Sequence, residues 1–331
     1  MYKRSLGKSG IEASVVGLGT WAIGGWLWGG TEEKSAVRAI HAALDNGITL
    51  IDTAPVYGFG RSEDIVGRAI ADRRDEVVLA TKCGLVWHME KGKFHFYSDD
   101  EGVTSTHTKH KIYKYLHPDS IAEEVEKSLK HLKTDRIDLY QTHWQDPTTP
   151  IEDTMAALLK LKDEGKIRAI GVSNAKLDEI KSYGRIDSAQ EKYSMLDRKI
   201  EKNGILEYCR KNNIAMLAYS PLALGLLTGK TKVGRQYGPK DLRINSQRFT
   251  SEYITRVNET LNEFSHLLET HNCTTAQLVI AWTFHQPGLT HVLCGARKPE
   301  QAFENAAAGD IQLTKNEIGR MNEIIMENLL T

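Results

Sequence analysis

Short apolar runs and longer amphipathic segments alternate along the whole chain. The runs are rich in β-branched residues and have the length of strands. Between most of them, apolar residues recur at helical spacing, as in AVRAIHAALDNG and PDSIAEEVEKSLKHL. Eight such runs lie at about residues 14–21, 48–54, 77–83, 137–143, 168–173, 187–192, 214–220 and 290–295.

The strand-like runs are almost continuously apolar, which is typical of parallel strands buried on both faces. Gly47 and Gly165 follow helical segments as helix-ending residues, and Pro118 with Asp119 begins another helix. Eight strand and helix units predict a closed (β/α)8 TIM barrel of the α/β class. A chain of 331 residues fits one such barrel, so we expect a single domain over residues 1–331.

Two segments do not fit the alternation of one strand and one helix. Residues 84–117 are polar and aromatic and carry five histidines, and residues 225–250 are rich in Gly, Lys and Arg. Both follow strand ends, so we expect them to be long loops at the C-terminal rim that act as lids or cofactor clamps. Residues 251–271 and about the last fifteen residues are predicted to be helices added to the barrel.

Charge and composition indicate which classes of molecule this protein binds. Forty-three basic residues balance forty-three acidic ones without a basic run, so the electrostatic footprint of a nucleic-acid-binding protein is missing. The N-terminal segment lacks the apolar core of a signal peptide, and nowhere do about eighteen apolar residues follow one another. The four cysteines are widely spaced without a CxxC pair, which argues against a zinc ribbon or a disulfide framework. We expect a soluble, cytoplasmic protein with a small-molecule partner.

Four polar residues stand where predicted strands end and turns begin. Asp52 and Tyr57 lie in LIDTAPVYG, Lys82 in VVLATKCG and His143 in IDLYQTHW. In an α/β barrel every strand delivers its last residues to one rim, so polar groups at successive strand ends converge. A carboxylate, a phenol, an amine and an imidazole are therefore predicted to share one site.

This set of groups suits the reduction of a carbonyl by hydride, which needs a proton donor and preorganised hydrogen bonds at the carbonyl oxygen. Tyr57 can donate the proton, and the ammonium of Lys82 is expected to lower the phenol's pKa by roughly one to three units. Asp52 can hold the charge of Lys82, and His143 can orient the carbonyl through one ring nitrogen.

Taken singly, each of the four residues has an ordinary structural explanation. An Asp after a strand is usually a turn or cap residue, a Tyr is usually core, a Lys is a solvated charge at the rim, and a His is a satisfied polar group. Their occurrence together at successive strand ends is what favours a catalytic site.

The segments LIDTAPVYGFGRSEDIVG, LATKCG, DLYQTHW and KIRAIGVSN, in this order, resemble the signature segments of the aldo-keto reductases. The resemblance covers essentially the whole chain and is strongest to the bacterial, general-stress-protein-like branch. It implies a (β/α)8 barrel that reduces aldehydes and ketones with NADPH and uses no metal. It also implies that Tyr57 is the acid, Lys82 its lysine partner, Asp52 the supporting aspartate and His143 the residue that orients the substrate.

The resemblance further implies how the cofactor is bound. Ser173, Asn174 and Gln190 would hold the nicotinamide carboxamide near Asp52, and Tyr219 would stack on the ring. The other positions that it implies are Thr20 and Trp21 for the ribose and pyrophosphate, Ser220, Pro221, Leu222, Ala223, Leu224, Lys230 and Arg243 for the pyrophosphate loop, and Gly295, Arg297, Gln301 and Asn305 for the adenosine end.

Arg297 can pair with the 2′-phosphate that distinguishes NADPH from NADH, so NADPH is the expected cofactor and NADH a weaker one. Some branches of the family have a lysine at Gly295 and an arginine at Gln301, which implies weaker affinity for the phosphate here. Three further departures from many relatives are Gln145, Ala175 and Ser194, which lie near the expected substrate and cofactor contacts.

Tryptophans gather near the strand ends, where they can wall the substrate site or simply pack at the rim. The residues expected to contact the substrate are Trp21, Tyr57, Trp87, His143 and Trp144, with Trp26 and Trp28 as further candidates for the wall. The histidines of residues 84–117 lack the spacing of an HExxH zinc site, so no metal is expected. GLLTGKT has one residue too few for a phosphate-binding P-loop, and GFGRSED lacks the third glycine of a dinucleotide fingerprint.

The sequence is compatible with three functions. The first is NADPH-dependent reduction of aldehydes and activated ketones to alcohols. The second is a cofactor-binding regulatory or accessory subunit built on the same barrel, with little turnover. The third is a non-redox isomerase or aldolase in which Lys82 forms an imine. The complete set of four polar residues favours the first.

Overall fold

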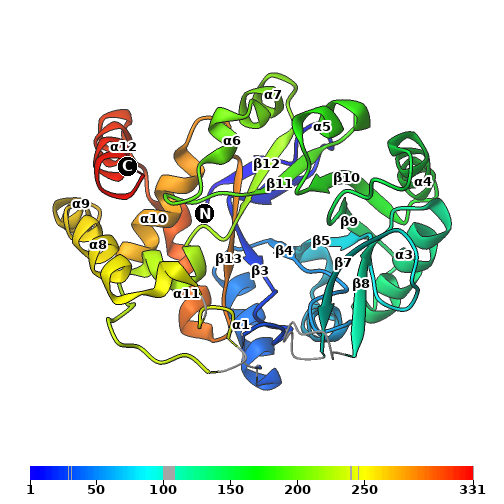
Figure 1. The fold of residues 1–331 in the computed structure, drawn as a ribbon, viewed down its shortest axis with the longest axis horizontal. Helices are drawn as coiled ribbons and strands as arrows, with labels where there is room; N and C mark the ends of the chain where they lie inside the picture. The colour runs from blue at the N-terminus through cyan, green and yellow to red at the C-terminus, as the bar shows by residue number, and fades with distance from the viewer. Residues whose placement is uncertain (29, 31, 100–108, 239–240, 245, 331) are drawn as a thin grey trace.

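The computed structural model describes every residue of the chain except 29, 31, 100–108, 239–240, 245 and 331. Eight parallel strands form a closed barrel, and each strand is paired with the next along the chain until the last pairs with the first. The predicted (β/α)8 barrel is confirmed (Figure 1). The barrel strands are β3 Val16–Gly19, β4 Leu50–Asp52, β5 Val78–Cys83, β9 Ile137–Thr142, β10 Ile167–Ser173, β11 Ser188–Lys192, β12 Ala215–Tyr219 and β13 His291–Gly295.

Helices surround the barrel (Figure 1). Most are amphipathic and bury an apolar face toward the core, whereas α10 is buried on almost all sides. The packed layer between strands and helices holds most of the buried aliphatic side chains. The helices are α1 Glu33–Asp45, α2 Arg61–Ala69, α3 Pro118–Leu132, α4 Ile151–Asp163, α5 Leu177–Tyr183, α6 Lys199–Lys202, α7 Ile205–Lys211, α8 Ser251–Asn262, α9 Ser265–Thr270, α10 Thr275–His285, α11 Pro299–Ala307 and α12 Lys315–Leu329.

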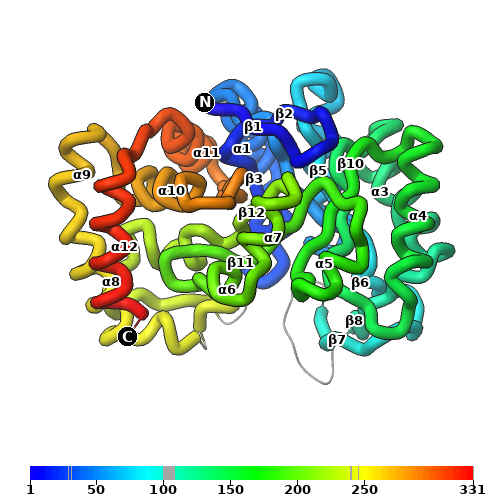
Figure 2. The backbone as a smooth tube through the Cα atoms, turned by 90° about the horizontal axis from the view of Figure 1, so that it is seen from above, coloured from blue at the N-terminus to red at the C-terminus, as the bar shows by residue number. Residues whose placement is uncertain are grey.

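A short hairpin of β1 Lys3–Ser5 and β2 Glu12–Ser14 closes the N-terminal end of the barrel (Figure 2). Its buried Leu6 and Ile11 join a cluster with Leu50, Leu139 and Leu217 inside the barrel. This apolar plug leaves the opposite, C-terminal end of the strands as the open side.

Residues 84–117, predicted to be a long loop, contain a three-stranded antiparallel sheet of β6 Leu85–Val86, β8 His110–Lys114 and β7 Lys93–Ser98. Residues 100–108 of this segment lie outside the described residues. The alternating aromatic and polar residues of KFHFYS explain the strand, because aromatic side chains favour a pleated, half-buried surface. This sheet lies at the end of the barrel opposite the N-terminal hairpin (Figure 2).

The two predicted C-terminal additions are present with one difference. Residues 251–271 form two helices, because the chain breaks at Glu263 and Phe264 between α8 and α9. The helix predicted at the C-terminus is α12, which packs beside α8 (Figure 1). The short 3₁₀ segments are η1 Arg74–Glu76, η2 Ala223–Thr228, η3 Gln247–Phe249 and η4 Ala308–Asp310.

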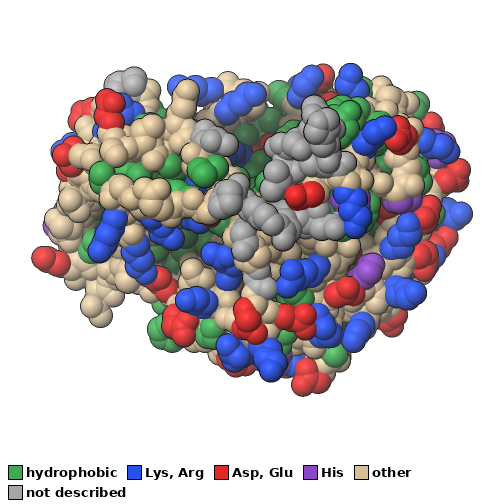
Figure 3. Space-filling view, turned by 60° about the horizontal axis from the view of Figure 1, so that its bottom comes forward, with side chains coloured by type: hydrophobic (Ala, Val, Ile, Leu, Met, Phe, Trp, Pro, Cys, Tyr) green, Lys and Arg blue, Asp and Glu red, His purple; other side chains and the backbone are tan. Residues whose placement is uncertain are grey.

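In the described part of the chain, every helix is too short or too polar to cross a membrane. All four cysteines are free thiols. Basic and acidic side chains are interspersed on the face shown in Figure 3, as the equal numbers of the two in the sequence lead one to expect.

Candidate active site

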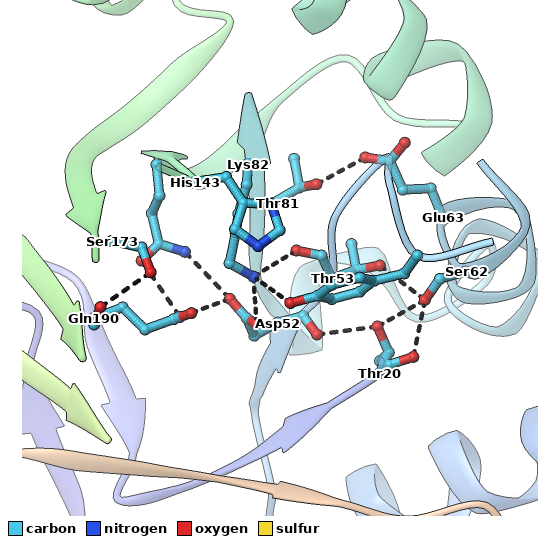
Figure 4. A network of polar contacts seen from close by, with 12 residues as sticks. Thr20, Asp52, Thr53, Ser62, Glu63, Thr81, Lys82, His143, Ser173 and Gln190 are labelled. Carbon is cyan, nitrogen blue, oxygen red and sulfur yellow. Dashed lines mark hydrogen bonds and ion pairs between the residues drawn. The ribbon is translucent and has the colours of Figure 1, made fainter. Parts of the chain in front are cut away.

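The four polar residues singled out in the sequence converge at the C-terminal end of the barrel. Asp52 is the last residue of β4, Lys82 lies near the end of β5, and His143 directly follows β9. Tyr57 lies in the turn between β4 and α2. Parallel strands in a closed barrel place these ends at one rim, and Figure 4 shows Asp52, Lys82 and His143 around one centre.

Lys82 is fully buried, and the three hydrogens of its ammonium have three oxygen partners. Its Nζ donates to Asp52 Oδ1 at 2.6 Å and to the carbonyl of Thr53 at 2.9 Å (Figure 4). It also donates to Tyr57 Oη at 3.4 Å. The lysine is therefore fixed between the carboxylate and the phenol.

The second carboxylate oxygen of Asp52 accepts two hydrogen bonds from amides. Gln141 Nε2 donates at 3.1 Å and Gln190 Nε2 at 3.0 Å. Gln141 lies on β9 two residues before His143, so it faces the same interior of the barrel. Gln141 was not predicted from the sequence to belong to the site. Its position two residues before His143 in DLYQTHW, on the same face of the strand, could have identified it as a site residue.

Burial and local charge set the protonation of these groups. Burial raises the pKa of Tyr57 well above its usual value, and the charge of Asp52 raises it further. The expectation that Lys82 would lower this pKa is wrong for the free protein, because the loss of hydration dominates. Burial also lowers the pKa of Lys82, and Asp52 opposes that shift. The pKa of His143 is lowered well below its usual value by burial and by the charge of Lys82.

At neutral pH the phenol is consequently protonated and the imidazole is neutral. A neutral imidazole has one donor nitrogen and one acceptor nitrogen. Tyr57 and His143 meet edge to face, with ring centroids 5.7 Å apart and planes at 83°. Two hydrogen-bond donors can therefore be directed at one substrate oxygen, with Lys82 behind the phenol.

A network of hydroxyl groups fixes the turn that carries Tyr57. Ser62, at the start of α2, donates to the hydroxyl of Thr20 at 2.8 Å and accepts from that of Thr53 at 2.9 Å (Figure 4). Thr20 itself donates to the carbonyl of Asp52 at 3.0 Å. The ring of Trp21 stacks on Tyr57 at 6.3 Å. These contacts join the ends of β3 and β4 around the phenol.

One cavity of about 620 Å³ extends from Tyr57 and His143 to Arg297 and Asn305. Ala223 does not line it, whereas the other residues expected to bind the cofactor do. Those residues are Thr20, Trp21, Asp52, Ser173, Asn174, Gln190, Tyr219, Ser220, Pro221, Leu222, Leu224, Lys230, Arg243, Gly295, Arg297, Gln301 and Asn305.

Most of the residues expected to contact the substrate also line the cavity, and one does not. Trp21, Tyr57, His143 and Trp144 line the cavity. Trp87 does not line it but packs edge to face against Phe59, with centroids 5.1 Å apart. Trp26 and Trp28, the two further candidates, are in the wall, as are His95 and Phe96 of β7.

The residues expected to hold the nicotinamide form a connected group beside His143. Asn174 Nδ2 donates to the carbonyl of His143 at 3.0 Å and to Ser173 Oγ at 3.1 Å. Tyr219 Oη donates to Asn174 Oδ1 at 2.8 Å. Ser173 Oγ donates to the carbonyl of Gln190 at 3.0 Å. The group therefore has a fixed geometry at the ends of β10, β11 and β12.

Gln145, a departure from many relatives, supports this group from behind. It is buried, and its Nε2 donates to Thr142 Oγ1 at 3.1 Å and to the carbonyl of Ser173 at 2.9 Å. Its Oε1 accepts from Tyr183 Oη at 2.8 Å. Ala175 and Ser194 are also buried, and Ala175 N donates to Glu191 Oε1 at 2.9 Å.

Cationic side chains line the other end of the cavity. The guanidinium groups of Arg243 and Arg297 lie over the ring of Trp28 at 5.3 Å and 6.0 Å. Arg235 also lines the cavity there. It was not among the residues predicted to bind the cofactor, although it lies in the predicted loop rich in Gly, Lys and Arg. Burial lowers the pKa of Arg297, and the nearby charge of Arg243 lowers it further.

Some of this positive charge is already balanced within the protein. The guanidinium of Arg243 donates two hydrogen bonds to Asp241, at 2.8 Å and 2.5 Å. Lys230 makes two to Glu304, both at 2.7 Å. Within the described residues, His, Cys, Asp and Glu side chains form no group of three that could hold a metal ion.

Comparison with known proteins agrees with this architecture. The sequence model of the aldo/keto reductase family matches residues 15–326. Aldo-keto reductase YhdN of Bacillus subtilis is 42% identical over 307 residues, which are 91% of this chain and 86% of that protein. The NADH-specific methylglyoxal reductase of Escherichia coli is 43% identical over 98% of both chains.

Solved structures give the same result. The glycerol dehydrogenase AKR11B4 from Gluconobacter oxydans superposes with a TM-score of 0.84 at 38% identity, over 97% of this chain and 94% of that chain. An aldo/keto reductase from Klebsiella pneumoniae in complex with NADP and acetate has a TM-score of 0.73 at 27% identity, over 98% and 96% of the two chains. The resemblance seen in the motifs is confirmed: this chain belongs to the aldo/keto reductase family and is a nicotinamide-dependent oxidoreductase.

Proposed function

We propose that this protein reduces aldehydes and activated ketones to alcohols with NADPH, and that Tyr57 donates the proton. The observation that carries the proposal is the contact of the Lys82 ammonium with both Asp52 and Tyr57 at the wall of a cavity whose far end is cationic. The wall offers a neutral acid and a neutral imidazole to one oxygen, with the buried cation of Lys82 behind the acid, which is what carbonyl reduction requires.

The residues of this chain have distinct tasks in the proposed reaction. NADPH, when bound, supplies the hydride that reaches the carbonyl carbon. Tyr57 and His143 orient the carbonyl by hydrogen bonds to its oxygen and stabilise the negative charge that develops there. Tyr57 then transfers its proton to that oxygen, which completes the alcohol. The phenolate that is left lies 3.4 Å from Lys82 Nζ, and the ammonium stabilises it.

The raised pKa of Tyr57 suits this role, because the phenol keeps its proton until a stronger base forms beside it. An alkoxide is much more basic than a phenolate, so the transfer remains downhill. Asp52 contributes indirectly, since its carboxylate keeps the buried Lys82 charged. His143 contributes as a donor, because its lowered pKa leaves it neutral.

The cavity residues fit a phosphorylated dinucleotide. Arg235, Arg243 and Arg297 can attract phosphate groups, and the turn at Leu224 and Gly225 has positive φ values of 60° and 93°, so backbone N–H groups can also face an anion. The relatives bind different cofactors: the enzyme from Escherichia coli is NADH-specific, and the Klebsiella structure holds NADP. The arginines are the reason for proposing NADPH here, with NADH as the weaker cofactor.

The decisive test is the Tyr57→Phe variant. We expect kcat/KM for 4-nitrobenzaldehyde with NADPH to fall by about 100-fold or more, because the ring is kept and only the proton donor is lost. Binding of NADPH and NADH, followed by fluorescence titration, should change by less than about twofold. Tyr113→Phe is the matched control, because this half-buried β8 tyrosine lies outside the cavity wall.

Three results would contradict the proposal. Near-normal turnover by Tyr57→Phe would remove Tyr57 as the donor. Negligible turnover by the unmodified protein across aldehydes and ketones, with intact NADPH binding, would favour the accessory-subunit alternative. Turnover without any nicotinamide, together with borohydride trapping on Lys82, would instead favour the imine-forming alternative.

A further inference from the structure

A β-bulge places a second histidine at the substrate end of the cavity. In the ladder between β7 and β8, Phe94 pairs with Tyr113 and Phe96 pairs with Ile112, so His95 is an extra residue without a partner. Consecutive residues of a regular strand face opposite sides, yet both His95 and Phe96 line the cavity. The bulge accounts for this, because it re-aims the inserted side chain.

Aromatic contacts fix the orientation of the His95 ring. It packs against Trp144 with centroids 5.1 Å apart and against Phe96 with centroids 4.8 Å apart. Trp144 directly follows His143, and the side chains of His95, His143 and Trp144 all line the cavity. The two imidazoles therefore belong to the same end of the cavity.

The His95 ring has hydrogen-bonding capacity that the described residues leave unused. No backbone or side-chain group among them hydrogen-bonds to either ring nitrogen. Burial and the nearby charge of Lys114 lower the pKa of His95 to about 4, so the imidazole is neutral at physiological pH. A neutral imidazole offers one donor and one acceptor.

The His95 ring lies among aromatic side chains of the cavity wall. Trp144 and Phe96 pack against it, and Trp26 stacks on Phe96 with centroids 5.9 Å apart. Among such side chains, a single imidazole with free nitrogens is a strong determinant of which substrates bind, because an unpaired polar group in an apolar site disfavours a ligand that cannot pair with it.

We infer that His95 selects short aldehydes that carry a second oxygen, as a hydroxyl or keto group, on the carbon next to the reacting carbonyl. This inference rests on the proposed reductase function. In it, Tyr57 and His143 hold the carbonyl oxygen that is reduced, and His95 hydrogen-bonds to the neighbouring oxygen. His95 is a specificity-determining residue and takes no part in the transfer of the hydride or the proton.

Three-carbon substrates provide a matched test. Glyceraldehyde and 2-oxopropanal carry the second oxygen, whereas propanal has the same carbon chain without it. The quantity to measure is the ratio of kcat/KM for each oxygenated aldehyde to kcat/KM for propanal. Comparing this ratio between protein variants cancels the intrinsic reactivity of the substrates.

His95→Phe keeps an aromatic ring against Trp144 and removes the hydrogen bond, so we expect the ratio to fall about tenfold. His95→Gln restores a donor and an acceptor and should recover most of the ratio. His88→Phe is the control, because His88 lies in the same segment but outside the cavity wall, and its ratio should match that of the unmodified protein.

The outcomes separate this inference from the proposed function. If the unmodified protein reduces propanal and the His95→Phe variant keeps the ratio, the reductase stands and the role of His95 is refuted. An equal fall in His88→Phe, or no recovery in His95→Gln, would assign the effect to packing of the sheet and also refute it. If the unmodified protein reduces 4-nitrobenzaldehyde but none of the three short aldehydes, the inference fails and the proposed function stands. If it reduces none of the four aldehydes, both fail.

Discussion

Asp52 connects the residues of the site more than any other side chain. One of its oxygens binds the Lys82 ammonium, and the other accepts from Gln141 and Gln190. Its charge acts on two neighbours in the same direction, because it raises the pKa of Lys82 and raises the pKa of Tyr57. Asp52 therefore keeps both groups protonated to higher pH than they would be without it.

This coupling predicts the pH dependence of an Asp52→Asn variant. Without the carboxylate, the pKa values of Lys82 and Tyr57 both fall, so the protonated forms that reduction requires are lost at lower pH. We expect the alkaline limb of the pH profile of kcat/KM to move down by about one unit or more. Asp45→Asn, at an exposed position far from the cavity, should leave the limb in place. If the alkaline limb of Asp52→Asn stays in place or moves to higher pH, the roles assigned to Asp52, Lys82 and Tyr57 are contradicted.

At the scale of elements, the turn after β3 sets the position of the turn that carries Tyr57. A Cβ atom on Gly24 would lie 2.5 Å from the carbonyl oxygen of Tyr57 and 2.8 Å from its carbonyl carbon. Backbone atoms cannot give way as a flexible side chain can, so the two turns can approach this closely only because residue 24 is glycine.

Gly24→Ala is therefore predicted to displace Tyr57 while the barrel stays folded. We expect kcat to fall about tenfold or more, since a displacement of about 1 Å at a catalytic group has effects of up to 100-fold. Steady-state kinetics with circular dichroism would measure activity and fold together. Gly319→Ala is the control, because a Cβ on this helical glycine meets no other atom and should leave kcat unchanged. Full activity in Gly24→Ala would show that the turns are not coupled.

The barrel and the four central residues could be predicted because their signals are local. Asp52, Lys82 and His143 each follow an apolar run, and parallel strands bring such ends together whatever the loops do. Three features had no local signal. The bulge at His95 depends on the pairing of β7 with β8, and Trp87 turns toward Phe59 instead of the cavity. The raised pKa of Tyr57 depends on complete burial, which packing decides.

At the scale of the whole molecule, buried carboxyl groups outside the proposed catalytic set affect the stability of the fold. Burial raises the pKa values of Glu63, Glu124 and Glu191 to about 7 each. Glu63 joins α2 to β5, because its Oε1 accepts from Thr81 Oγ1 at 2.7 Å (Figure 4). Its other oxygen has no hydrogen-bond partner in the described part of the chain.

The sign of the resulting pH effect follows from proton binding. Between pH 4.5, the usual pKa of a glutamate, and about pH 7, the folded protein keeps a proton on Glu63 that the unfolded chain has released. The free energy of unfolding therefore falls as the pH rises through this range, and it stays lower above it. At 1.36 kcal/mol for each pKa unit, Glu63 alone accounts for roughly 3 kcal/mol at most.

Glu63→Gln removes the titrating group and keeps a side chain of the same shape. We expect the free energy of unfolding of this variant, relative to the unmodified protein, to increase by about 2–3 kcal/mol between pH 5 and pH 8. Urea unfolding at a series of pH values would measure the difference. Glu300→Gln, at an exposed position on α11, should show a difference that is independent of pH. A pH-independent difference for Glu63→Gln as well would mean that Glu63 is ionised in the folded protein, and its contact with Thr81 would then have to offset the cost of burying a full charge.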